Sequence, residues 1–156
     1  MRFSNLHIFL VLSNLSLLLF SCDRAEKHPL PGVPVNFIIN VYNDAEFIKL
    51  RAIGNSQEIK AYMLGYATLG YDNNGVIVYN NSGDEYYAFD MTCPFDLPNS
   101  VAVELDGSSV AICPQCGTHY ILPSNGYPST EGPGKWPLKQ YRAFFNPNTG
   151  DVQVSN

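Results

Sequence analysis

The chain has 156 residues, of which 14 are acidic and 9 are basic, and its formal charge is −5. This length suits one domain, and the apolar share of 46% is too high for an intrinsically disordered protein. Nucleic-acid-binding proteins need a basic surface, so the acidic balance argues against nucleic acid as a partner.

The N-terminal residues have the pattern of an export signal. Arg2 gives a positive start, and the apolar run over residues 8–20 is shorter than the roughly 20 residues of a membrane-spanning helix. The run ends at Leu19-Phe20-Ser21-Cys22, which resembles the lipobox of bacterial lipoproteins. Residues 1–21 are therefore predicted to be a lipoprotein signal peptide and Cys22 its lipidation site, with an ordinary signal peptide as the alternative. Lipidation would anchor the protein to a membrane of the cell envelope, facing outside the cytoplasm.

Residues 22–34 are predicted to form a lipidated tether. This segment has prolines at positions 29, 31 and 34 and charges of both signs, so we expect it to be extended and without a core of its own. His28 is expected to be a solvated residue of the tether. The folded domain is then residues 35–156.

The remainder of the chain is rich in short apolar, β-branched and aromatic segments. Clusters of Gly, Asn and Asp separate them, and Asp106-Gly107 predicts a hairpin. Strands are predicted over residues 35–42, 59–64, 75–79, 85–92, 101–105, 110–113, 118–122, 141–146 and 151–154. A short helical turn is expected over residues 43–50, and no helix of ten residues. This pattern predicts an all-β fold, an antiparallel sandwich or barrel.

Charge is unevenly distributed along the chain. There is no Lys or Arg from residue 61 to residue 134. The same stretch contains the acids Asp72, Asp84, Glu85, Asp90, Asp96, Glu104, Asp106 and Glu131. One interpretation is a solubilising acidic face, and the other is a surface that meets a partner protein with a basic surface.

Three cysteines remain after Cys22, and two short motifs contain them. Cys93-Pro94 follows one predicted strand, and Cys113-Pro114-Gln115-Cys116-Gly117 follows another. An odd number of cysteines in an exported domain indicates a metal site, a free thiol or an intermolecular bond. The alternatives to metal are a disulfide, Cys113–Cys116 or Cys93–Cys113, and a thioredoxin-like redox pair, which needs a helix that this β-rich region does not predict.

Two further residues are candidates for a fourth ligand beside the three cysteines. Asp96 would give the spacing Cys-x2-Asp-x16-Cys-x2-Cys, close to that of a zinc ribbon. His119 is a good ligand type, but it leads into a predicted strand. The alternatives are a turn residue for Asp96 and a hydrogen-bonding or surface histidine for His119.

Several segments match one family in the order in which they occur. They are residues 87–90, Cys93-Pro94, residues 113–120, the Gly- and Pro-rich residues 132–138, residues 139–141 and a closing hairpin that ends at Val154. Together they resemble a Rieske-type ferredoxin domain over residues 35–156. The resemblance implies a Rieske-like antiparallel sandwich or barrel with a small cluster-binding subdomain of two facing loops.

The same resemblance implies a [2Fe–2S] cluster and one-electron transfer. Cys93 and Cys113 match the family's cysteine pair, whereas its two histidine positions hold Phe95 and Cys116. The predicted function is therefore a lipid-anchored iron–sulfur electron carrier. The alternative is a binding or structural module of the same fold with Zn²⁺, a disulfide or an empty site. An enzyme is the least supported option, because no Ser/His/Asp set or phosphate loop is present.

Overall fold

The computed structural model describes residues 27–107 and 109–156. The predicted signal peptide and Cys22 lie outside the described residues. Within them, none of the helical segments has the length and apolar character that crossing a bilayer requires.

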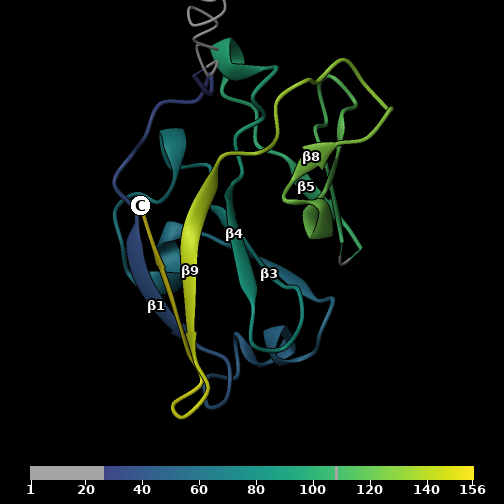
Figure 1. The fold of residues 1–156 in the computed structure, drawn as a ribbon. Helices are drawn as coiled ribbons and strands as arrows, with labels where there is room; N and C mark the ends of the chain where they lie inside the picture. Colours follow the sequence, from purple (N-terminus) through teal and green to yellow (C-terminus); the bar gives the residue numbers. More distant parts are fainter. Residues whose placement is uncertain (1–26, 108) are drawn as a thin grey trace, which may run out of the picture.

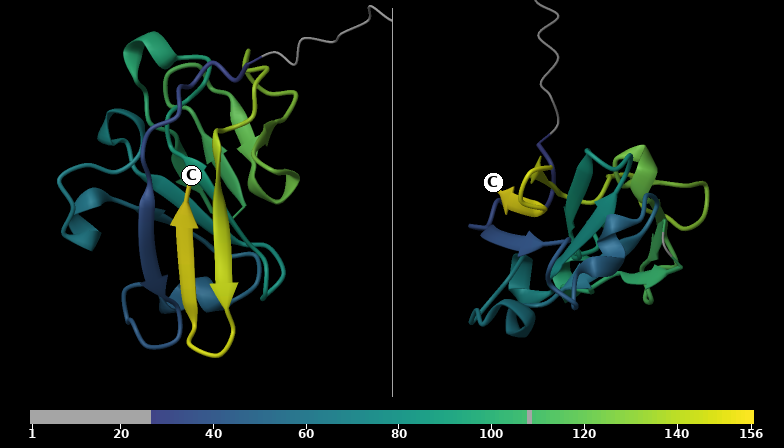
Figure 2. Two further views of the ribbon diagram at one scale, coloured as in Figure 1. Left: turned by 60° about the vertical axis from the view of Figure 1, so that its left-hand side comes forward. Right: turned by 90° about the horizontal axis from the view of Figure 1, so that it is seen from below.

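A six-stranded antiparallel sheet forms the larger part of the molecule (Figure 1). In spatial order its strands are β1 (Asn36–Asn40), β10 (Asp151–Ser155), β9 (Gln140–Asn146), β4 (Tyr86–Asp90), β3 (Val76–Asn80) and β2 (Ser56–Ile59). Figure 2 shows β1, β10 and β9 side by side, and the register pairs Ile39 with Val152 and Val152 with Phe145. The last strand of the chain therefore lies between the first strand and β9.

A second, smaller antiparallel sheet lies beside the first, in green in Figure 1. Its strands are β5 (Glu104–Asp106), β6 (Val110–Ile112), β7 (His119–Ile121) and β8 (Tyr127–Pro128), in that order. β5 and β6 form the hairpin predicted from Asp106-Gly107. Each strand has only two or three residues, so the backbone hydrogen bonds of this sheet are few.

Side chains alternate between the core and solvent in the larger sheet. In β1, Phe37 and Ile39 are buried while Ile38 between them is 58% exposed. This is the pattern of an antiparallel sheet with one covered face. Among the described residues there is no α-helix, only short 3₁₀ turns at Ile48–Arg51, Ala61–Leu64, Tyr71–Asn73, Leu97–Asn99 and Leu122–Ser124. The prediction of an all-β fold built from antiparallel sheets is confirmed.

The buried side chains form two groups. One is the apolar core of the larger sheet, and the other lies between the two sheets. Phe89 of β4 and Tyr120 of β7 are both fully buried within it. Cys93 and Cys113 belong to the same group and are also fully buried. The candidate ligands are therefore part of the core that joins the smaller sheet to the larger one.

One predicted strand was wrong in place, and one strand was missed. Residues 59–64 were expected to form a strand, but β2 ends at Ile59 and Ala61–Leu64 is a 3₁₀ turn. Gly65 ends that turn in the left-handed conformation, and its N–H bonds back to the Ala61 carbonyl. Strand β8 was missed because two residues give no alternating pattern.

The segment over residues 27–34 packs against the domain. Leu30 is only 1% exposed, and the ring of His28 is hydrogen-bonded to the Pro137 carbonyl at 2.9 Å. His28 also meets Trp136 edge-on. His28 therefore contacts the loop before β9, and the expectation that it is a solvated residue of the tether was wrong.

Candidate metal centre

The first loop of the site connects β4 to β5 over residues 91–103. The N–H of Cys93 donates to the Val101 carbonyl at 2.8 Å, which joins the two ends of the loop. The side-chain amide of Asn74 donates to the Ser100 carbonyl at 3.0 Å from outside the loop. Both ends of the loop are thus fixed, and the position of Cys93 with them.

Asp96 lies at the middle of the first loop. It is the residue before the 3₁₀ turn η5 (Leu97–Asn99), yet its side chain makes no capping bond to that turn. The carboxylate points instead toward the cysteines and is 7% exposed. A buried carboxylate is costly unless it is paired, so its partners decide what the site can bind.

The second loop connects β6 to β7 and has the form of a metal knuckle. The N–H of Gly117 donates to the Cys113 carbonyl at 2.9 Å, and Gly117 has the positive φ of 71° that such a turn requires. The backbone N–H groups of Gln115 and Cys116 point at the Cys113 sulfur. Donors aimed at a sulfur favour its thiolate form, which is the form that binds metal.

The two loops bring four donor groups together. Cys93, Asp96, Cys113 and Cys116 each offer a ligand atom, and all four atoms lie within 4.8 Å of one another. The sulfurs of Cys93 and Cys116 are 3.8 Å apart. The Asp96 Oδ2 atom lies 3.1 Å from the Cys113 sulfur and 3.8 Å from that of Cys93.

These separations are close to those around a single tetrahedral ion. With metal–sulfur bonds of about 2.3 Å and a metal–oxygen bond of about 2.0 Å, two sulfurs lie ~3.8 Å apart and a sulfur and an oxygen ~3.5 Å apart. In a [2Fe–2S] centre the four ligands divide into two pairs, one on each iron, with the bridging sulfides between them. The donors form one group here, so as arranged they fit one metal ion and do not fit a two-iron cluster.

The other predicted ligand positions lie outside this group. His119 is on β7, where alternation turns it away from buried Tyr120, and its Nδ1 atom lies 3.0 Å from the Glu131 carboxylate. Phe95, at a histidine position of the resembled family, is 52% exposed. The structure therefore joins Asp96, and not His119, to the three cysteines.

The three cysteines are free thiols in the structure. Cys113 and Cys116 lie between the antiparallel strands β6 and β7, not at the start of a helix. The thioredoxin-like alternative needs that helix, because its dipole lowers the pKa of the reactive cysteine. The geometry thus favours a metal site over a redox pair.

Three polar side chains support the ligands, and for Thr118 and Tyr120 this role was not predicted from the sequence. Thr118 Oγ1 accepts from the Gly134 N–H at 3.0 Å, so its own hydrogen is left for the Cys116 sulfur at 3.2 Å. The Tyr120 hydroxyl lies 3.1 Å from the Cys93 sulfur. Gln115 donates to Asp96 Oδ1 at 3.1 Å, which leaves Oδ2 for the centre.

The loop over residues 131–137 covers the second cysteine loop from outside. A Cβ atom at Gly132 would lie 2.4 Å from Thr118 Cα, and one at Gly134 would lie 2.6 Å from the Thr118 side chain. Only glycine permits this approach. The fully buried Thr118 thus connects the covering loop to a candidate ligand.

Burial of the site disfavours the presence of several negative charges on its cysteines and Asp96 at the same time. Burial raises the pKa of Cys113 well above its usual value, and burial followed by nearby Asp96 raises the pKa of Cys116. Burial alone would raise the pKa of Asp96, but hydrogen bonds from the three cysteines and Gln115 bring it below its ordinary value. Without metal, the site therefore holds a carboxylate among neutral thiols, and a cation would displace the thiol protons.

No family model matches the chain, and no curated protein matches it. Among solved structures, the chain is similar to a protein described as the small subunit of an NADH-dependent nitrite reductase from Mycobacterium tuberculosis. The two share 16% sequence identity with a TM-score of 0.43, over 80% of this chain and 97% of that one.

Proposed function

We propose that this protein is a metal-binding domain in which Cys93, Asp96, Cys113 and Cys116 hold one zinc ion. The observation that supports this best is the single group of four ligand atoms within 4.8 Å. Thiolates select zinc or iron among the common divalent metals. Four protein ligands leave no open position, which is typical of a structural site and not of a catalytic one.

The role of the ion is to hold the two loops together. Two of its ligands come from the loop between β4 and β5, and two come from the loop between β6 and β7. It thereby joins the larger sheet to the smaller sheet, whose short strands supply little stability of their own. Metal binding of this kind contributes directly to the free energy of folding.

Metal analysis of the full chain, purified without oxygen, tests this function. We expect one zinc per chain, no acid-labile sulfide and no visible absorption, because the filled d shell of Zn²⁺ allows no d–d transitions. Two irons and two sulfides per chain would contradict it.

One-electron transfer through a [2Fe–2S] cluster is the second candidate. The order of the motifs over residues 35–156 favours it, as does the match of Cys93 and Cys113 to the Rieske cysteine pair. It requires the four donors to separate into two pairs, and the same analysis would reveal it as iron and sulfide. A redox partner with a basic surface belongs to this candidate. Two acids of the acidic stretch, Asp90 and Asp96, are buried and would not contribute to such a contact.

We also propose that Cys22 is lipidated and anchors the domain to a membrane of the cell envelope. The sequence supports this through the apolar run over residues 8–20 that ends just before the cysteine. Lipid chains supply about 0.8 kcal/mol per buried CH₂, so more than one chain anchors firmly. Cys22→Ser should lose the mass of the lipid and leave the membrane fraction. An unchanged mass and fractionation would contradict lipidation.

A further inference from the structure

An aromatic groove lies beside the metal centre. It consists of two hollows, each of about 340 Å³, on either side of Lys135 and Trp136. The first hollow is lined by Pro29, Pro94, Phe95 and Pro133, and the second by His28, Tyr127 and Pro137, in addition to the two shared residues. Phe95, in the first cysteine loop, belongs to this groove, and we call the whole surface the aromatic groove below.

The chemistry of the aromatic groove is that of a membrane interface. Phe95 is 52% exposed and Tyr127 is 57% exposed, and Trp136 between them is half-buried. Lys135 is exposed, and no acidic residue lines either hollow. Exposed aromatic rings next to lysine are typical of surfaces at the lipid headgroup level. In a chain with a net charge of −5, a groove without acids is suited to anionic headgroups.

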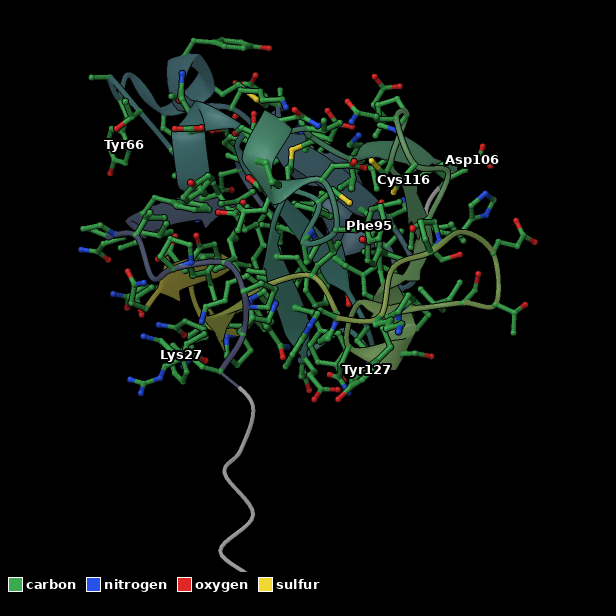
Figure 3. All side chains as sticks on the ribbon, turned by 90° about the horizontal axis from the view of Figure 1, so that it is seen from above. Lys27, Tyr66, Phe95, Asp106, Cys116 and Tyr127 are labelled. Carbon is green, nitrogen blue, oxygen red and sulfur yellow. The ribbon has the colours of Figure 1, made fainter. Side chains whose placement is uncertain are left out.

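The aromatic groove also lies where the chain leaves toward the proposed anchor. Pro29 and His28 line the groove, and exposed Lys27 directly precedes them. Figure 3 shows Lys27, Phe95 and Tyr127 in a view from the end of the molecule that is uppermost in Figure 1. Four residues lie between Cys22 and Lys27, so the two are five residue steps apart, at most roughly 17 Å when fully extended. A lipid on Cys22 would therefore keep this end of the domain close to the bilayer.

We propose that the aromatic groove is a docking surface for the membrane itself, with anionic lipid headgroups as its ligand. The proposal rests on the lipid anchor at Cys22 and not on the identity of the metal. It gives the domain a fixed orientation, with the two cysteine loops toward the bilayer. The metal centre then has a second effect, because it fixes the loop that places Phe95 in the groove.

The single tryptophan of the chain reports on this contact directly, because that residue is Trp136. The full, lipidated chain is placed in vesicles of phosphatidylethanolamine and phosphatidylglycerol whose acyl chains have bromine near the headgroup. Co-sedimentation first shows that the chain is anchored. We expect Trp136 emission to move to shorter wavelength and to fall by about half relative to vesicles without bromine, as for an interfacial ring.

Matched variants separate the groove from the anchor. Tyr127→Ser should reduce the quenching of Trp136, whereas Tyr62→Ser, which changes an 80% exposed tyrosine outside the groove, should leave it unchanged. Lys135→Gln should weaken the contact with anionic vesicles about fivefold. An anchored chain whose Trp136 is not quenched would overturn the proposal. A chain that does not sediment with vesicles would overturn it as well, through the loss of the anchor.

Discussion

The two sheets of this protein differ in the length of their strands and in the side chains of their cores. The six-stranded sheet has strands of four to seven residues and a continuous apolar core that includes Phe37, Ile39 and Val152. The four-stranded sheet has strands of two or three residues, and its core includes Cys93 and Cys113. If the proposed metal binds, we expect the first sheet to fold on apolar burial alone and the second to depend also on the ligands between its loops. Substitutions in each region separate the contribution of metal binding from that of apolar burial.

Removing a ligand should have the largest effect. Cys113→Ser is expected to abolish metal binding, and the free energy that structural zinc contributes to small sites is about 10–16 kcal/mol. Hydrogen exchange should then show lost protection in both cysteine loops while β1, β9 and β10 stay protected. The same substitution at Cys22 is the control and should leave the metal content unchanged. Full protection of the loops in Cys113→Ser would show that the centre does not stabilise the smaller sheet.

Acid should release the metal before it unfolds the larger sheet. The raised pKa values of Cys113 and Cys116 mean that metal binding releases thiol protons, so a lower pH favours the metal-free state. Asp96 has a lowered pKa and stays ionised, so it releases no proton on metal binding; its stabilising hydrogen bonds are lost only as the pH falls through that pKa. With the two thiols of raised pKa, Cys113 and Cys116, affinity should fall by up to about a hundredfold, ~2.7 kcal/mol, per pH unit. Competition with a chelator measures this slope, and a flat profile would contradict thiolate ligation.

A cavity in the core of the larger sheet should lower the free energy of unfolding without changing metal binding. Ile39→Ala removes a side chain that is 2% exposed in β1 and should cost about 2–5 kcal/mol of unfolding free energy. Metal content per folded chain should not change. Ile38→Ala, one position along the same strand and 58% exposed, should change stability by less than about 0.5 kcal/mol. Chemical denaturation measures both, and equal effects at the two positions would refute the assignment of faces in β1.

The smallest effect on metal binding is expected from changing Thr118, which is a hydrogen-bond partner of a ligand and not a ligand itself. Thr118→Val removes the hydroxyl that lies between the Gly134 N–H and the Cys116 sulfur. Loss of such a supporting group typically lowers metal affinity about 10- to 100-fold. Thr118→Ser keeps the hydroxyl and should retain most of the affinity. If Val and Ser variants bind metal equally, Thr118 acts only by packing against the covering loop.

Most of the fold could be predicted because the pattern of the larger sheet is local. The apolar, β-branched residues of β1 and the Asp106-Gly107 turn each predicted the structure found there. The prediction from sequence missed Ser56 and Gln57 of β2. Both side chains are buried, but they are polar and so do not form the apolar pattern of a strand. The prediction also could not place Leu30, because an isolated apolar residue in a proline-rich segment does not indicate what it packs against.

The candidate site could be predicted only as far as residue types allow. The cysteines and Asp96 were identified from their spacing, and His119 remained a second candidate because histidine is a good ligand type. Register decides between them, because His119 and Tyr120 alternate on β7 and Tyr120 is the buried one. The contacts of Tyr120 with the Cys93 sulfur and of Thr118 with Gly134 arise only when segments distant in the sequence come together in the fold. No local pattern contains that information.

X-ray absorption at the metal edge shows whether one metal ion binds three sulfurs and one carboxylate oxygen. For the full chain purified without oxygen, we predict a zinc edge. The first shell should contain three sulfurs at about 2.3 Å and one oxygen at about 2.0 Å, with no second metal nearby. Asp96→Ala should remove or replace the protein oxygen while the three sulfurs remain. An iron edge with a neighbouring iron and bridging sulfides would contradict the account and establish the two-iron cluster in its place.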